Sequence, residues 1–327
     1  MMAELARDYF NDLQTNSPDS SRGTRDEAIH DVLESIDRLL PERRRGQLSQ
    51  MLTEHDVREA LRNSPSGKAM GLNGIPYELW KMMDEEYDRT KANRKPLTNI
   101  VRLLTEVYND METFGVCERS DFTEGWLCLI YKKGDPRLIS NYRPITLLNC
   151  NYKIFTKAYA MKMVEVAHTM IHENQAGFMP HRSIFDQVRL TKMMLSYAEA
   201  MEMNGAIAYD YLWRTLEAFQ IPDRFIQTVR LLYDHANTIV IINGERSTPF
   251  AVTRGVRQRD PLLCLLFNLA IEPLVCMLRK STLTGFHIPG VADKLIVSMF
   301  ADDTTAYLAC HDSLDRRCLA SRLRKPR

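Results

Sequence analysis

Residues 295–309 read Leu-Ile-Val-Ser-Met-Phe-Ala-Asp-Asp-Thr-Thr-Ala-Tyr-Leu-Ala, and this stretch decides the fold class. Two runs rich in apolar and β-branched residues flank the adjacent Asp302 and Asp303, a pattern that predicts a strand, a tight turn and a returning strand. A turn can direct neighbouring carboxylates at one point, where they repel unless a cation lies between them. Hard cations such as Mg²⁺ prefer oxygen ligands. Because an Asp-Asp pair is also ordinary turn chemistry, its meaning depends on the rest of the chain.

The composition is that of a globular protein, without the strong net positive charge of a basic nucleic-acid-binding protein or the long apolar runs of a membrane protein. The 327 residues suffice for one large domain or two, and 45% apolar with 26% charged residues is typical of soluble chains. The formal net charge is +1, so any basic surface must be local. Seven cysteines form no C-x-x-C pair, which favours an intracellular protein, nuclear or cytoplasmic. No apolar run reaches the ~18–20 residues of a membrane span.

Periodicity predicts a helical N-terminal third, residues 1–115, followed by a mixed α/β remainder, residues 116–327. Predicted helices cover about 25–40, 57–61, 76–83, 97–108, 152–172, 184–203, 211–219, 222–235 and 261–278. A short β-prone run at 126–131 precedes a basic turn. The clearest hairpin joins 238–242 to 248–252 through Asn243-Gly244, because Asn-Gly supplies the positive φ angles of a type I′ turn.

Two irregular basic stretches are candidates for phosphate binding. The first carries Lys132 and Lys133 in a turn after the β-prone run, with Arg143 nearby. The second, residues 175–183, carries Arg182. Lysine and arginine side chains presented by turns suit phosphate groups, and solvated basic loops without a ligand are the alternative interpretation.

Six stretches in this order resemble the reverse transcriptase domain of a non-LTR (LINE-type) retrotransposon polyprotein. They are Gly67-Lys68-Ala69 with Gly74-Ile75-Pro76; Ile130-Tyr131-Lys132-Lys133; Asn141-Tyr142-Arg143-Pro144-Ile145; Gln175-Ala176-Gly177-Phe178 with Arg182-Ser183; Gly255-Val256-Arg257-Gln258 with Asp260-Pro261-Leu262; and Phe300-Ala301-Asp302-Asp303. Each motif is weak to moderate alone, and their order makes the signal specific. The resemblance covers roughly residues 50–310.

The resemblance implies an α+β fold, the fingers and palm of a right-hand polymerase. Helix-rich fingers would lead into a palm with a small antiparallel sheet and packed helices. The implied activity is that of an RNA-directed DNA polymerase acting on an RNA template, a DNA primer and deoxynucleoside triphosphates. The primer 3′-hydroxyl would attack the α-phosphate of the nucleotide while two Mg²⁺ ions stabilise the attacking and leaving oxygens. No membrane partner is expected, and the oligomeric state does not follow from the sequence.

The family also suggests roles for individual residues. Asp302 and Asp303 would be catalytic and hold the metal. The nucleotide- and template-binding residues would be Lys132, Lys133, Arg143, Arg182, Tyr209 and Gln258. The lysines and Arg143 would neutralise the triphosphate, and Arg182 would lie near template or nucleotide. Tyr209 would exclude a ribose 2′-hydroxyl by its bulk, and Gln258 would touch the sugar and base-pair region.

The third carboxylate of the palm is the main departure from the family, whose pattern is Asp-x-x-x-Ala-(Phe or Tyr)-Asp after an apolar strand. Counting back from Ala208-Tyr209-Asp210 puts Asn204 at the first position, and an amide binds Mg²⁺ less well than a carboxylate. Asp210 abuts the next helix, so we expect an internal deletion that removed the central strand. A stub strand at 206–209 would present Asp210 as the third ligand; alternatively, Asp210 caps the following helix.

Further departures predict a truncated, degenerate copy. Arg259 and His181 stand where the family usually has glycine, which costs backbone freedom. The chain ends soon after the aspartate pair. We therefore expect that the thumb is missing and that no endonuclease domain precedes residue 1. We therefore expect a polymerase that is inactive or very weak. The alternatives are a non-catalytic nucleic-acid-binding remnant and a translated fragment without function.

Overall fold

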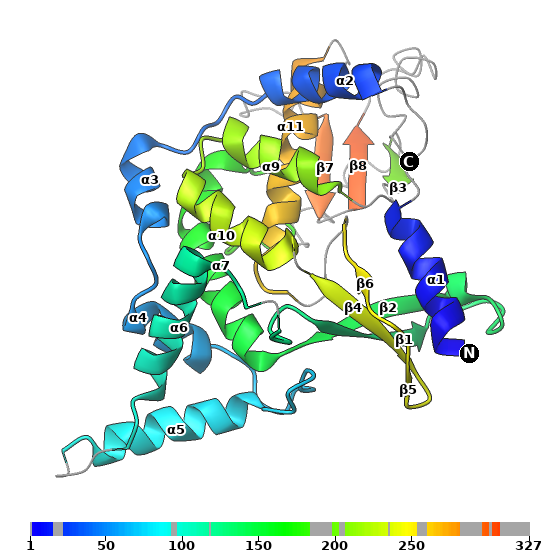
Figure 1. The fold of residues 1–327 in the computed structure, drawn as a ribbon. Coiled ribbons are helices and arrows are strands. Elements are labelled where there is room, and N and C mark those ends of the chain that lie inside the picture. Colours follow the sequence, from blue (N-terminus) through cyan, green and yellow to red (C-terminus); the bar gives the residue numbers. More distant parts are fainter. Residues whose placement is uncertain are drawn as a thin grey trace.

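The computed structural model describes most of the chain. The described residues are 2–15, 22–92, 97–117, 119–183, 198–202, 207–234, 236–253, 260–281, 296–300 and 303–307. Figure 1 shows two separate sheets beside the group of helices, with the small sheet next to α11 and the large sheet next to α1. In the described part of the chain, no helix is long and apolar enough to cross a membrane.

The elements alternate after a helical start. The helices are α1 (Met2–Thr15), α2 (Arg22–Glu34), α3 (Glu42–Ser49), α4 (Glu54–Arg62), α5 (Tyr77–Thr90), α6 (Ile100–Phe114), α7 (Cys150–Met170), α9 (Tyr209–Ala218), α10 (Asp223–Asp234) and α11 (Leu263–Lys280), with a 3₁₀ turn at Ile139–Asn141. The strands are β1 (Gly125–Tyr131), β2 (Tyr142–Leu148), β3 (Ala198–Glu202), β4 (Asn237–Ile242), β5 (Glu245–Arg246), β6 (Phe250–Ala251), β7 (Val297–Phe300) and β8 (Asp303–Tyr307).

The large sheet has the order β2-β1-β4-β5, with β6 also paired to β4. β1 runs antiparallel to β2 and parallel to β4, so the sheet is mixed. The predicted Asn-Gly hairpin is confirmed: Asn243 and Gly244 have φ angles of 52° and 83°, and they join β4 to β5. α1 covers one face of this sheet, where Phe10 packs with Leu127 and Val240.

The small sheet has the order β3-β8-β7 and is antiparallel, as the resemblance implies. β3 is a correction to the sequence analysis, because a helix was predicted over 184–203 and residues 198–202 form a strand. Residues 184–197 lie outside the described part of the chain. The isolated segment reads as helical, and pairing with the backbone of β8 overrides that local preference.

The main core lies around α7, the longest helix. Its Phe155 is fully buried and stacks on Tyr108 of α6 with ring centroids 4.7 Å apart. The ring of Tyr159 meets the Phe155 ring edge-on, with centroids 5.3 Å apart. Such aromatic clusters bury large apolar areas and fix relative helix positions. α7 therefore ties the N-terminal helices to α11, and its Tyr159 also contacts Phe225 of α10.

The loop after α4 is held against the start of α7. Asn149, the N-cap residue of α7, is fully buried; its Oδ1 accepts a hydrogen bond from the Asn73 amide, and its Nδ2 donates to the Asp121 carbonyl. Gly71 passes so close that a Cβ there would lie 2.4 Å from the Asn149 nitrogen. This position therefore requires glycine for close backbone approach.

Replacing Gly71 by alanine is expected to lower the free energy of unfolding by about 1–3 kcal/mol, because a backbone atom would have to shift. Urea unfolding followed by circular dichroism measures the change. Gly46→Ala in α3 is the matched control, since nothing lies within 4 Å of its added Cβ. That helical substitution should stabilise by roughly 0.5–1 kcal/mol. Equal effects at the two positions would contradict the packing of Gly71.

Candidate functional site

Asp303 lies at the start of β8, at one end of the small sheet. Phe300, the last residue of β7, pairs with Asp303, the first residue of β8, so the chain turns between them as the sequence predicts. Asp302 lies outside the described residues. Val297 and Met299 of β7 are buried against α11, where they pack with Ile271 and Val275. The apolar face of the strand thus anchors the hairpin to a buried helix.

β3 runs antiparallel to β8 and thus lies beside this hairpin. Its register pairs Glu202 directly with Asp303. Paired positions on antiparallel strands lie on the same face of a sheet. The strand next to β8 is therefore formed by residues 198–202, which precede the Ala208-Tyr209-Asp210 motif. Asn204 lies outside the described residues.

Asp210 is not the helix N-cap, so that interpretation is wrong. Of the stub strand predicted at 206–209, Tyr209 is helical and Ala206 lies outside the described residues. α9 begins at Tyr209 with Ala208 as its N-cap, so Asp210 lies in the first turn. There it forms a two-point ion pair with Arg25 of α2, with Nη1–Oδ2 and Nη2–Oδ1 distances of 2.6 and 2.8 Å. In a neighbouring ion pair the acid comes from α2 and the base from α9: the distance from Asp26 Oδ1 to Arg214 Nη1 is 2.7 Å. The Arg25 guanidinium holds the pKa of the Asp210 carboxyl below its usual range.

Replacing Asp210 by asparagine is expected to lower stability at pH 7 by less than ~1 kcal/mol, because the pair is partly exposed and screened. A depressed carboxyl pKa contributes stability that is present above about pH 4 and is lost as the pH falls through the folded-state value. The difference between the two proteins should therefore shrink in acid. Urea unfolding between pH 3 and 7 measures it, and a double-mutant cycle with Arg25→Ala isolates the pair. Zero coupling would contradict the ion pair.

A hard cation at the hairpin would need several oxygen ligands. Asp303 and, in register, Glu202 are residues of the right chemistry. Asp210 does not fit that role, because Arg25 occupies both of its carboxylate oxygens. Within the described ranges, no group of three His, Cys, Asp or Glu residues could hold a metal ion. The described residues thus do not supply a three-carboxylate site.

The hairpin formed by β1 and β2 presents the basic turn. Lys132, Lys133 and Arg143 are exposed, and the structure shows no ion pair between them and other described residues. The loop between the strands is held from both sides: the Tyr131 hydroxyl donates to the Gly134 carbonyl at 2.6 Å, and the Tyr142 hydroxyl donates to the Pro136 carbonyl at 2.9 Å.

The same loop is fixed at its centre. Gly134 has a φ of 93°, which favours glycine, and the Asn141 amide donates to the Asp135 carbonyl at 2.9 Å. Tyr131 and Tyr142 are cross-strand partners whose rings meet edge-on at 5.6 Å. The loop is therefore ordered before any ligand binds, which lowers the entropic cost of binding.

The face of the large sheet opposite α1 is only partly buried. It carries Trp126, Cys128 and Ile130 of β1, which alternate with the buried Leu127. The Arg246 guanidinium of β5 lies 4.7 Å from the Trp126 ring centroid. Arg143 is the cross-strand partner of Ile130 and is exposed at the end of this face. The face thus combines an aromatic ring with cations.

Arg182 is directed at the backbone of its own loop. Its guanidinium donates to the carbonyls of Ile171, His172 and Gln175 at 3.2, 2.6 and 2.8 Å. The side chain is partly buried, and burial lowers the pKa of this guanidinium. Arg182 thus differs from Arg143, which is exposed.

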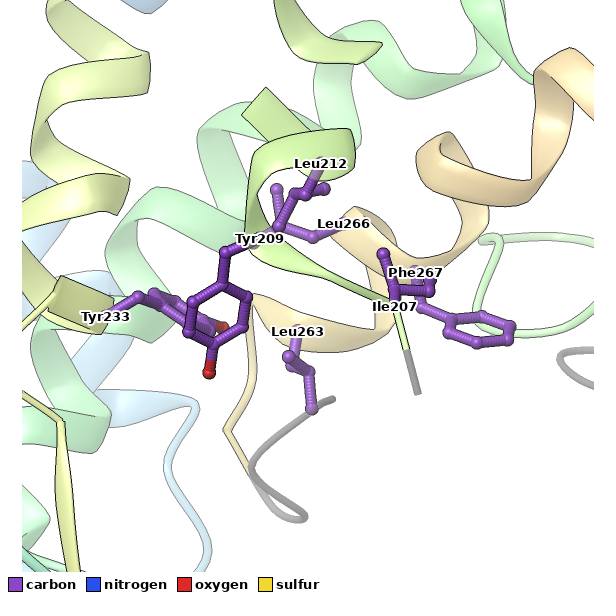
Figure 2. Close-up of a pocket in the computed structure, with 7 residues that line it drawn as sticks. All are labelled: Ile207, Tyr209, Leu212, Tyr233, Leu263, Leu266 and Phe267. Carbon is purple, nitrogen blue, oxygen red and sulfur yellow. The ribbon is translucent and has the colours of Figure 1, made fainter. Parts of the chain in front are cut away.

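Tyr209 lines a small apolar hollow between the ends of three helices. Figure 2 shows its ring beside Tyr233, with Leu263, Leu266, Phe267, Leu212 and Ile207 completing the wall. The Tyr209 and Tyr233 rings meet edge-on at 5.4 Å. Tyr209 is therefore part of an aromatic cluster at the start of α9 and is only partly buried. Gln258 and Arg259 lie outside the described residues.

Asp260 lies three residues before the start of α11. It is buried, accepts a hydrogen bond from the Tyr152 hydroxyl at 2.9 Å, and accepts another from the Leu262 amide at 3.0 Å. Asp260 precedes a helix that the sequence predicts over 261–278. The structure starts α11 at Leu263, with Leu262 as N-cap, so Asp260 braces the turn before the helix.

Sequence reasoning missed several residues of the site region. Arg25 lies far from any motif, and Trp126 with Arg246 forms a contact between strands distant in sequence. Asn268 of α11 is fully buried, and its side-chain amide donates to the Gly177 carbonyl at 2.6 Å. Asn268 is a polar residue within the apolar helix predicted over 261–278. That pattern is the one sequence signal for its contact with Gly177, because a buried polar group needs a hydrogen-bond partner.

Comparison with known proteins agrees with this architecture. The chain is 32% identical over 328 residues to the transposon TX1 uncharacterized 149 kDa protein of Xenopus laevis, covering 95% of this chain and 23% of that protein. It is 27% identical over 188 residues to the Pol polyprotein of the R2 element of Popillia japonica, covering 54% and 26%, and 27% identical over 180 residues to the probable RNA-directed DNA polymerase from transposon X-element of Drosophila melanogaster, covering 50% and 20%.

The chain spans about a quarter or less of the length of these relatives. Residues 130–322 match the family described as reverse transcriptase (RNA-dependent DNA polymerase). This span includes the basic loop after β1, β2, α11 and both strands of the aspartate hairpin. The named relatives are non-LTR retrotransposon proteins. The chain therefore belongs to the reverse transcriptase family, in its non-LTR retrotransposon branch.

Proposed function

We propose that this reverse transcriptase domain binds nucleic acid through its basic hairpin and carries out little or no nucleotidyl transfer. The observation that carries the proposal is the ordered β1–β2 hairpin, which presents Lys132, Lys133 and Arg143 without ion-pair partners among the described residues. Lysine and arginine bind phosphates, and an ordered loop pays less entropy on binding. RNA template, DNA primer and deoxynucleoside triphosphates are the ligands that the family suggests.

The open face of the large sheet supports the same ligands. Single-stranded nucleic acids are bound by grooves that combine cations with aromatic side chains, on which bases stack. Trp126, with Arg246 over its ring, supplies both on one face. By family analogy, Tyr209 would border the nucleotide sugar and Gln258 would contact the base-pair region.

The proposal of weak or absent catalysis rests on the third carboxylate. Mg²⁺, bound by Asp302 and Asp303 in the family's reaction, would stabilise the attacking and leaving oxygens. Asp210 is engaged by Arg25, and the strand beside the hairpin is β3, which offers Glu202 in place of an aspartate. A longer side chain at a different backbone position would disturb the near-octahedral geometry that Mg²⁺ demands.

Primer extension tests the catalytic part of the proposal. With an RNA template, a DNA primer, deoxynucleoside triphosphates and Mg²⁺, we expect no more product from the full chain than from its Asp302→Asn variant. Robust extension by the unmodified chain that disappears in Asp302→Asn would overturn the claim of weak catalysis. Both proteins should bind the primer–template equally, because the substitution leaves the basic hairpin unchanged.

A further inference from the structure

The turn at residues 171–177 lies directly against the strand that leads into the aspartate pair. The Met299 amide donates to the Asn174 carbonyl at 2.8 Å, and the Ala176 amide donates to the Met299 carbonyl at 2.9 Å. Gln175 thereby forms a parallel bridge with Met299. Met299 precedes Phe300, the partner of Asp303. The position of the turn therefore sets the position of β7 on the side opposite β8.

The side chain of Arg182 holds this turn together by hydrogen bonds to its backbone. Its guanidinium reaches the carbonyls of Ile171, His172 and Gln175, which come from successive points of the turn. Backbone carbonyls in a buried turn need donors, and one planar guanidinium can serve several of them in a fixed arrangement. Lysine could not reproduce that arrangement with a single ammonium group.

A second clamp comes from α11. The buried Asn268 donates its side-chain amide to the Gly177 carbonyl at 2.6 Å. Within the turn, the Gly177 amide donates to Gln175 Oε1 at 2.8 Å, and the Asn174 amide donates to His172 Nδ1 at 3.1 Å. Because α11 also packs against β7, the turn and the strand share one rigid support.

We propose that Arg182 is a positioning residue for the aspartate hairpin and that it acts through the 171–177 turn rather than by touching template or nucleotide. The inference rests on the proposed function only in taking this hairpin as the metal-binding site of the domain. On this proposal the two arginines have different roles. Arg143 contacts the nucleic acid, and Arg182 holds the backbone of the 171–177 turn.

Hydrogen–deuterium exchange on the full chain distinguishes the two roles. In Arg182→Ala, peptides that cover 174–176 and 297–300 should exchange at least about tenfold faster, because the turn loses its internal donors and opens more often. The salt dependence of single-stranded RNA binding should stay unchanged. In Arg143→Ala, exchange of these peptides should stay unchanged, and the slope of log K against log salt should fall by about 0.7.

The opposite pattern overturns the proposal. Exchange within about twofold of the unmodified protein in Arg182→Ala, or a reduced salt slope without faster exchange, would show that Arg182 does not position the hairpin. If Arg182→Ala fails to fold, Arg182→Lys keeps the charge, and its two peptides should still exchange faster while those of α7 do not. If Arg143→Ala leaves RNA binding intact, the proposed function fails, and the exchange result still decides the role of Arg182.

Discussion

Replacing Lys132, Lys133 and Arg143 together by alanine is expected to weaken binding of single-stranded RNA on the order of 10- to 100-fold near 0.1 M salt. Each exposed contact with a phosphate contributes up to ~1 kcal/mol, and a tenfold change in affinity is about 1.4 kcal/mol. The slope of log K against log salt should fall by about 2, since each neutralised phosphate of a single strand contributes about 0.7. Fluorescence anisotropy between 50 and 300 mM salt measures both quantities.

The matched control removes the same charge elsewhere. Arg89, Lys91 and Arg102 lie on or beside α5 and α6, and their side chains are 75%, 59% and 67% exposed. Replacing these three by alanine changes the net charge equally and should leave the salt slope within about 0.5 of the unmodified protein. Equal losses in the two triple variants would show that RNA binding follows overall charge, and they would sink the assignment to the hairpin.

Replacing Phe155 by alanine is expected to lower the free energy of unfolding by about 3–5 kcal/mol. The side chain is fully buried, and its removal leaves a cavity beside Tyr108 and Tyr159, whose rings lose their partner. For a domain of marginal stability this is a large fraction of the total. Thermal and urea unfolding monitored by circular dichroism measure the change.

The exposed Phe114 is the matched control, because its side chain is 83% exposed and ends α6. Phe114→Ala should change stability by less than about 0.5 kcal/mol. The comparison also tests the alternative that the chain is a translated fragment without a stable fold. Absence of a cooperative transition in the unmodified chain would favour that alternative and would remove the basis for a buried role of Phe155.

These experiments separate the binding of nucleic acid from nucleotidyl transfer, because we assign the two activities to different parts of the domain. The basic hairpin belongs to the large sheet, and the aspartate hairpin belongs to the small sheet. A missing third carboxylate, which the sequence leads us to expect, would affect only the aspartate hairpin. A chain of this kind is expected to hold nucleic acid after it has lost the geometry needed for nucleotidyl transfer.

Local sequence rules predicted the features that local interactions control. The aspartate hairpin turns between Phe300 and Asp303, and Asn243-Gly244 makes the expected turn with positive φ angles. A helix is predicted over 57–61, and α4 covers that range, opened by a capping box of Thr53 and Asp56. The order of the six motifs identified the family, because each motif serves a fixed position in the fold.

By itself, then, the sequence determined the family, the aspartate hairpin and the basic turn, since all three depend on neighbouring residues. Only the tertiary structure decided what individual side chains do. Asp210 is engaged by Arg25, which is 185 residues away; Arg182 faces backbone carbonyls; and residues 198–202 become a strand because β8 offers an edge. Such outcomes depend on contacts between distant segments, and their energies exceed the small local preferences that a sequence pattern records.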